Sequence, residues 1–103
     1  MEESKILDAS ALIAKEVGLT TIFGIIEYPP ASTYCDIIFP VEEDFDLALD
    51  ISSKLREIGK PIGTVDILVA SMCINRDKEL LTKDRDFGII QTIHPKFRFK
   101  IMK

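Results

Sequence analysis

Two short apolar segments end on aspartate, and these acids are the first candidates for chemistry. Residues 5–8 form a predicted strand that ends at Asp8, and residues 79–82 form another that is followed by Asp84 and Asp86. Open α/β sheets bind ligands at the carboxyl ends of their strands. Carboxylates gathered there repel one another unless a cation neutralises them. The pattern therefore predicts oxygen ligands for a hard divalent ion, Mg²⁺ or Mn²⁺.

Two further acids stand where predicted elements begin or end. Glu27 precedes a Pro-Pro pair, and Asp66 falls in the first turn of a nearly all-apolar helix predicted for residues 65–75. A helix dipole favours a carboxylate in the first turn, so a purely structural Asp66 remains an alternative. A helix that apolar must pack on several sides, which would bring Asp66 close to the edge of the sheet. The predicted metal ligands are Asp8, Glu27, Asp66, Asp84 and Asp86.

The remaining reactive side chains suggest no competing site. His94 is the only histidine and has no evident Ser or Cys partner, so we expect it at the surface. Cys35 and Cys73 stand alone, and we expect both to be reduced, with Cys73 in the core. Neither glycine-rich phosphate-binding pattern occurs in the sequence.

Charge is distributed unevenly along the chain. Residues 1–59 carry 12 acids and 4 Lys or Arg, a balance of −8, whereas residues 60–103 carry 5 acids and 9 Lys or Arg, a balance of +4. On a strand, Lys96, Arg98 and Lys100 share one face, opposite Phe97 and its apolar neighbours. That face is either the solvated side of an edge strand or a stripe that binds phosphate.

The rest of the chain supplies the elements that must position the acids. Strands are predicted at residues 5–8, 19–22, 36–39, 79–82 and 97–102; helices are predicted at 9–17, 27–34, 42–58 and 65–75, with a short helix or turn at 85–91. Gly18 and Gly59 are predicted helix stops, and Thr64 is a predicted N-cap. Strands alternating with helices predict an α/β fold, a three-layer sandwich with a mainly parallel central sheet, in one domain over residues 1–103.

No apolar run approaches the roughly 20 residues that a membrane-spanning helix needs. The chain also opens without a basic-then-apolar leader. We therefore expect a cytoplasmic protein that does not enter a membrane.

Four segments closely resemble the signature segments of PIN domains, in the right order. They are Leu-Asp-Ala-Ser-Ala-Leu-Ile at residues 7–13, Ile-Glu at 26–27, Gly-Thr-Val-Asp-Ile-Leu-Val-Ala at 63–70 and Leu-Leu-Thr-Lys-Asp-Arg-Asp-Phe at 80–87. The branch they resemble is the prokaryotic toxin ribonucleases of the virulence-associated protein C (VapC) type. By that resemblance, the acidic positions of the family match Asp8, Glu27, Asp66 and Asp84. Asp86 matches an additional acid of some members, and Ser10 a hydroxyl that supports the first aspartate.

The resemblance implies an endoribonuclease of the toxin–antitoxin type that uses Mg²⁺ or Mn²⁺ and has RNA as its substrate and an antitoxin as its partner. Only 19 positions separate Asp8 from Glu27, where the family usually has a longer helical hairpin. A reduced PIN domain that binds RNA or protein without catalysis is therefore the alternative. The acids and the small α/β size also suit a phosphate-accepting receiver domain, but the strand-end Lys of that fold is missing. The small apolar domain and the resemblance together predict a homodimer.

Overall fold

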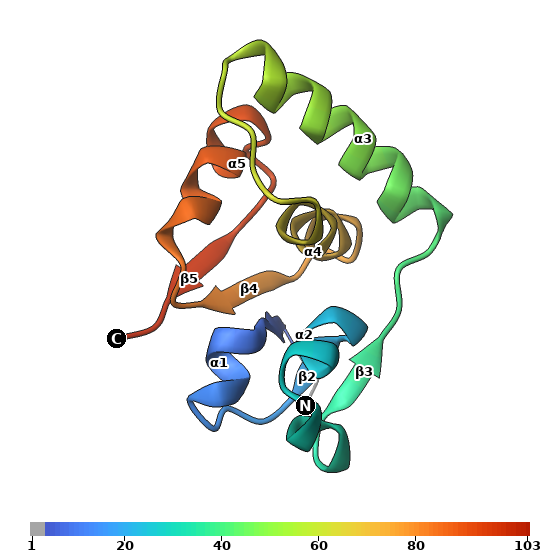
Figure 1. Ribbon diagram of the computed structural model, residues 1–103, viewed down its shortest axis with the longest axis vertical. Helices are drawn as coiled ribbons and strands as arrows, with labels where there is room; N and C mark the ends of the chain where they lie inside the picture. The colour runs from blue at the N-terminus through green and yellow to red at the C-terminus, as the bar shows by residue number, and fades with distance from the viewer. Residues whose placement is uncertain (1–3) are drawn as a thin grey trace.

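Five short strands form one parallel sheet in the computed structural model, which describes residues 4–103. The strands are β1 (Lys5–Leu7), β2 (Leu19–Thr21), β3 (Asp36–Ile38), β4 (Glu79–Thr82) and β5 (Phe99–Ile101). They lie in the order β3-β2-β1-β4-β5, and each neighbouring pair is parallel. The predicted α/β fold with a mainly parallel sheet is confirmed (Figure 1).

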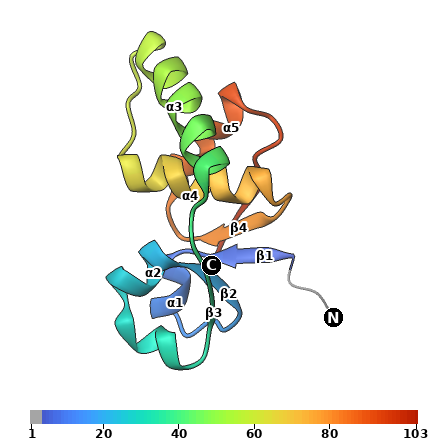
Figure 2. The same cartoon turned by 90° about the vertical axis from the view of Figure 1, so that its right-hand side faces the viewer.

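Helices cover both faces of this sheet. They are α1 (Ala9–Ile13), α2 (Ile22–Glu27), α3 (Glu42–Glu57), α4 (Thr64–Asn75) and α5 (Gly88–Ile93), with 3₁₀ turns η1 (Pro29–Thr33) and η2 (Arg85–Phe87). In Figure 2, α3, α4 and α5 lie above β1 and β4, whereas α1 and α2 lie below them. This arrangement confirms the predicted three-layer sandwich. Within residues 4–103, no helix is long and apolar enough to cross a membrane.

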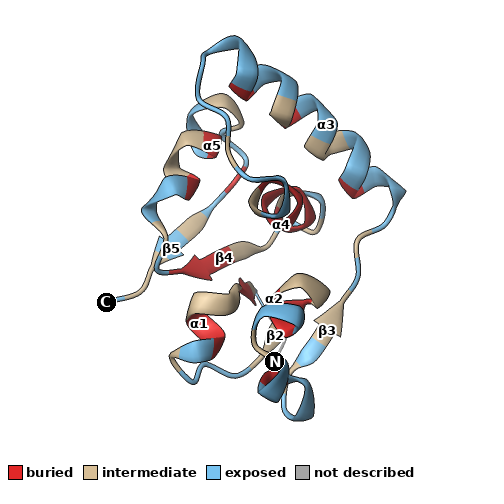
Figure 3. Ribbon diagram, viewed as in Figure 1, coloured by how far each residue is buried: buried red, intermediate tan, exposed pale blue. Residues whose placement is uncertain are grey.

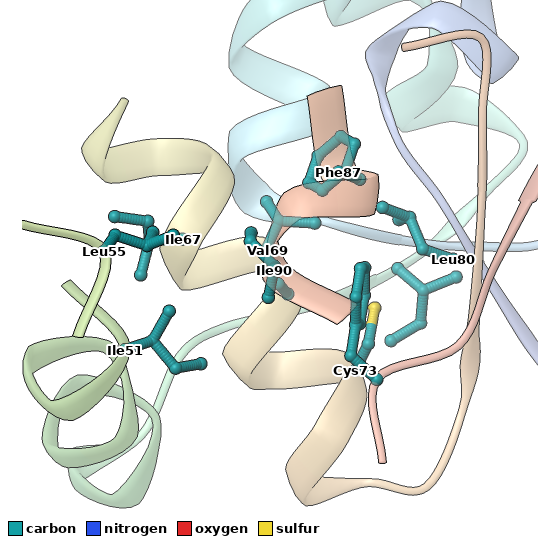
Figure 4. Close-up of a cluster of buried hydrophobic side chains, with 11 residues drawn as sticks. Ile51, Leu55, Ile67, Val69, Cys73, Leu80, Phe87 and Ile90 are labelled. Atoms are coloured by element: carbon teal, nitrogen blue, oxygen red, sulfur yellow. The ribbon is translucent and has the colours of Figure 1, made fainter. Parts of the chain in front are cut away.

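The two central strands pack into a separate core on each face. Ile6 and Leu80 are fully buried in the larger core with α3, α4 and α5, part of which Figure 4 shows. Leu7 and Leu81, the next residues along each strand, pack with α1 and α2 in the smaller core. Alternate residues of a strand point to opposite faces, so burial on both faces requires the continuous apolar sequence seen here.

Helix α4 lies between the sheet and α3 and is buried along most of its length (Figure 3). Every residue from 67 to 73 is buried, as expected for a helix without a polar face. Ser71 satisfies its hydroxyl by donating to the Ile67 carbonyl at 2.8 Å. Cys73 lies in the core, as predicted, and burial raises the pKa of its thiol to about 12. Asp66 in the first turn is only partly buried, so its carboxylate can reach solvent.

Helix α3 buries a narrower stripe than its broad apolar pattern suggests. Ile51 and Leu55 are fully buried against α4, whereas Phe45 is 51% exposed and Leu49 is 71% exposed. The reason is the position of α3 at the outside of the molecule, where only its inner side has a neighbour (Figure 1). Gly59 ends the helix as predicted, with a left-handed φ of 73° that suits glycine.

A buried ion pair, which the sequence analysis did not predict, joins α3 to α4. Asp44 is fully buried, and its two carboxylate oxygens accept from Arg76 Nη1 at 2.9 Å and Nη2 at 3.0 Å. Val41 N and Asn75 Nδ2 also donate to Asp44, at 2.8 Å and 2.9 Å. Burial alone would raise the pKa of Asp44, but the hydrogen bonds from Arg76, Val41 and Asn75 outweigh it, and the pKa is lowered.

Two helices in the first third of the chain differ from prediction. Helix α1 ends at Ile13 rather than at residue 17, because Lys15 adopts a left-handed φ of 74°. The helix predicted for residues 27–34 is wrong, since α2 begins earlier, at Ile22, where Thr21 Oγ1 accepts from Gly24 N at 3.2 Å. Residues 29–33 instead form the 3₁₀ turn η1, which is separated from α2 at the residue before Pro29.

Two predictions near the carboxyl half also need correction or extension. Thr64 is the first residue of α4 rather than its N-cap, a position that Gly63 occupies without a side-chain hydrogen bond. Strand β5 is shorter than predicted and lies at an edge of the sheet. Lys100 is exposed there, whereas Phe99 on the other face is partly buried, as the alternation predicts.

Candidate metal centre

The sheet places Asp8 and Asp84 at the same edge. Strands β1 and β4 are parallel neighbours, with Leu7 opposite Leu81, so the residues that follow both strands emerge together. Asp8 N donates to the Leu81 carbonyl at 3.2 Å and continues the ladder by one bond. The sequence analysis predicted this adjacency from strand ends alone.

Both carboxylate oxygens of Asp8 are held in place. Asp8 is the N-cap of α1, and its Oδ1 accepts from Ala11 N at 3.2 Å and from Ser10 Oγ at 2.6 Å. Its Oδ2 accepts from the hydroxyl of Thr82. A carboxylate with two hydroxyl donors has a fixed orientation, which is what a ligand at a shared site requires.

The same two hydroxyls also fix the backbone after β4. Thr82 Oγ1 accepts from Asp84 N at 3.0 Å, and Ser10 Oγ accepts from Lys83 N at 2.9 Å. Thr82 is fully buried, so its own bonds are shielded from water, whereas the bond between Ser10 and Lys83 is exposed. The sequence analysis did not identify Thr82 as a site residue. The available signal was a hydroxyl at the last position of a strand, two residues before an acid.

Asp84 also caps a local turn. Its Oδ1 accepts from Asp86 N at 2.8 Å, which makes Asp84 the N-cap of η2. The second carboxylate oxygen has no hydrogen-bond donor within residues 4–103. Oδ1 of Asp84 therefore caps the turn, while Oδ2 is available as a metal ligand.

The four acids that match the family motif line one cavity. It has a volume of about 190 Å³, and its acidic lining residues are Asp8, Glu27, Asp66 and Asp84. Four different segments supply them: the end of β1, the end of α2, the first turn of α4 and the end of β4. Asp86 is not among the residues that line this cavity. It is exposed and lines a neighbouring cavity, which it shares with Asp66.

Asp66 is the acid whose ionisation is most clearly affected by the others. Burial raises the pKa of its carboxyl, and the negative charges of Asp84, Glu27, Asp8 and Asp86 raise it further, in that order. All four of these acids were predicted to share the site with Asp66. Their repulsion acts across the cavity and would be relieved by a cation placed among them.

The chemistry of this lining suits a hard cation. Its possible ligands are carboxylate and hydroxyl oxygens, and neither His94 nor either cysteine lines the cavity. Oxygen ligands of this kind favour Mg²⁺ and Mn²⁺ over zinc. Within residues 4–103, no three Asp, Glu, His or Cys side chains are already grouped closely enough to hold a metal ion.

His94 lies at the end of α5 and does not belong to this site. It is half-buried rather than fully at the surface as predicted. Its Nδ1 is buried and has no hydrogen-bond partner in the described part of the chain.

The chain is similar to known proteins in structure but not detectably in sequence. No family model and no curated protein sequence matches the chain. The structure of VapBC2 from Rickettsia felis, bound to a DNA fragment from their promoter, superposes with a TM-score of 0.75 at 15% identity, over 96% of this chain and 98% of that chain. VapBC-5 from Mycobacterium tuberculosis, a member of the VapBC family of toxin–antitoxin systems, gives a TM-score of 0.68 at 15% identity, over 97% and 98%. The chain therefore shares its fold with these two VapBC structures.

This shared fold explains why these particular acids meet. Its parallel sheet brings Asp8 and Asp84 to one edge, and the helices on its two faces bring Glu27 from one side and Asp66 from the other. The likeness of fold to VapBC2 extends over nearly the whole chain.

Proposed function

We propose that this chain is a divalent-metal-dependent endoribonuclease of the toxin–antitoxin type, which hydrolyses phosphodiester bonds in RNA. The observation that carries the proposal is one cavity lined by Asp8, Glu27, Asp66 and Asp84 in a PIN fold. A phosphodiester is an anion, so this acidic cavity can accept it only with a cation present.

Asp8, Glu27, Asp66 and Asp84 would hold Mg²⁺ or Mn²⁺, with Asp86 as an additional acid beside them. When bound, such an ion activates water and neutralises charge on a phosphodiester oxygen. Binding would require the carboxylates to converge, and the repulsion on Asp66 is the interaction that a cation reverses. Ser10 and Thr82 orient Asp8 through its two oxygens.

Cleavage of single-stranded RNA tests the proposal. Wild type should cleave with Mg²⁺ or Mn²⁺ and lose activity in excess chelator. Asp8→Asn should reduce cleavage at least 100-fold, because one charged ligand is lost while the hydrogen bonds of the cap can still form. Asp50→Asn is the matched control, since Asp50 is an exposed acid paired only with Lys54 on α3. Cleavage that resists both chelator and Asp8→Asn would refute the proposal.

A partner and a dimer belong to the same proposal. Both similar structures are VapBC toxin–antitoxin structures, so we propose an antitoxin as the partner of this chain, acting in the cytoplasm. We also propose a homodimer, since Phe39, Phe45 and Leu49 leave more than half of their surface exposed. Light scattering of the isolated chain checks this, and a monomer at every concentration would exclude the dimer.

The second candidate is a PIN domain that binds RNA or protein without cleaving it. The favouring observation is the short segment between Asp8 and Glu27, in which α1 has only 5 residues and α2 only 6. Glu27 is also exposed, unlike the other acids of the cavity, which are partly buried. RNA binding without cleavage at any metal concentration would favour this candidate.

A further inference from the structure

A larger cavity lies beside the acid cavity and carries two cationic side chains. It has a volume of about 750 Å³ and is lined by the loop before α4, by η2 and by the start of α5. Lys60 lies on the loop and Arg85 on η2. Asp66 lines both cavities, so the two are continuous at that residue. The volume is within the range of about 300–1,000 Å³ found for small-ligand sites.

The two cations of this cavity have no partner among the residues that the structure describes. Both Lys60 and Arg85 are exposed, and within residues 4–103 neither charged group makes a hydrogen bond or an ion pair. By contrast, Arg76 binds Asp44, and Lys54 binds Asp50. An unpaired guanidinium and ammonium facing one cavity can bind phosphate oxygens without breaking any existing contact.

A second cavity beside the acids is mainly apolar. It has a volume of about 260 Å³ and is lined by Phe23, Ile26 and Val65, together with Glu27 and Asp66, with no cation among these residues. Of these two cavities, only that of Lys60 and Arg85 therefore places positive charge beside the acids.

We propose that the cavity of Lys60 and Arg85 binds the sugar–phosphate backbone of single-stranded RNA next to the phosphodiester held at the acids. This inference rests on the proposed function and adds the direction in which the strand leaves the metal centre. Arg85 supplies a planar fork for a phosphate and Lys60 a point charge. Of the two acids of this cavity, Asp66 also lines the acid cavity, where the metal is expected.

Salt dependence of RNA binding tests the inference. A fluorescent single-stranded RNA is titrated by anisotropy with KCl varied, and constant Ca²⁺, another hard cation that takes oxygen ligands, replaces Mg²⁺ so that the acids stay neutralised while cleavage is suppressed. Each phosphate contact on a single strand contributes about −0.7 to the slope of log K against log salt. The double substitution Lys60→Gln with Arg85→Gln should therefore make the slope shallower by about 1.4. The control, Lys15→Gln with Lys54→Gln, removes the same charge elsewhere and should leave the slope within about 0.3 of the parent.

The outcomes separate this inference from the proposed function. An unchanged slope in the Lys60/Arg85 variant, in a protein whose wild type cleaves RNA, overturns the inference alone. An equal loss of slope in the control also overturns it, because the effect would then be one of net charge. Absence of both RNA binding and cleavage overturns the inference and the proposed function together. Melting curves of both double variants verify that these exposed substitutions leave the fold intact.

Discussion

Replacing Arg76 by alanine should destabilise the protein by about 3–5 kcal/mol, because it leaves a buried charge without its cation. Asp44 is fully buried and would keep only the bonds from Val41 N and Asn75 Nδ2. The side chain of Arg76 is itself only 23% exposed, so little solvent screens the pair. Because domains of this size are stable by about 5–15 kcal/mol, the loss would be a large share of the total.

The pH dependence of this loss has a defined sign. The pKa of Asp44 is lowered in the folded state from its ordinary value of 3.8, so its contribution to stability is fully present above about pH 4 and is lost as pH falls through the folded pKa. Without Arg76, burial dominates and the pKa of Asp44 rises. The difference in stability between wild type and Arg76→Ala should therefore be largest at neutral pH and should shrink as Asp44 takes up a proton.

Urea unfolding between pH 3 and pH 8 measures this difference. The chain has no tryptophan, so far-UV circular dichroism is the suitable signal. Lys54→Ala is the control, because it breaks an exposed pair with Asp50, which is worth about 0.3–0.5 kcal/mol. A cost for Arg76→Ala below about 1 kcal/mol, or one that grows as pH falls, would refute the reasoning.

Three further substitutions test the site and its support. Asp84→Asn can still accept from Asp86 N, so the metal-free variant should be as stable as wild type or more so. Its melting temperature should, however, no longer rise with Mn²⁺. A variant that loses stability and keeps this rise would make Asp84 purely structural. Thr82→Val removes a buried donor to Asp8 and should lower the free energy of unfolding in urea by about 1–3 kcal/mol and weaken Mn²⁺ binding. Unchanged stability and unchanged Mn²⁺ affinity would show that the bond is dispensable. Gly24→Ala would place a Cβ 2.6 Å from Thr20 Oγ1 and should lower the free energy of unfolding by about 1–3 kcal/mol, measured by thermal melting. Gly63→Ala, whose new Cβ meets no described atom within 4 Å, should leave that free energy nearly unchanged. Equal effects of the two substitutions would contradict this expectation.

The sequence predicted the acids at the strand ends because their signal is local. An apolar run that stops at Asp8 or before Asp84 identifies the strand and its end together, and parallel pairing then brings these ends to one edge. Asp66 was predicted to belong to the site because it lies in the first turn of an unusually apolar helix. These arguments need no contact between distant residues, which is why they could be made from sequence.

Other features depend on distant contacts and could not be predicted. Glu42, Glu43 and Asp44 look alike as acids of a first helical turn, and only Arg76, more than thirty residues away, distinguishes Asp44. The early start of α2 depends on capping by Thr21, whose β-branched sequence context favoured a strand. The failure of Asp86 to line the acid cavity depends on the turn of η2.

Direct titration with Mn²⁺, followed by the electron paramagnetic resonance of the free ion, tests the central claim that Asp8, Glu27, Asp66 and Asp84 share a divalent cation. Wild type should remove Mn²⁺ from solution with a saturable stoichiometry, and Mg²⁺ should compete. Asp66→Asn should weaken binding at least tenfold, whereas Asp50→Asn should bind as wild type does. Identical Mn²⁺ binding by wild type and Asp66→Asn, or no saturable binding at all, would contradict the account.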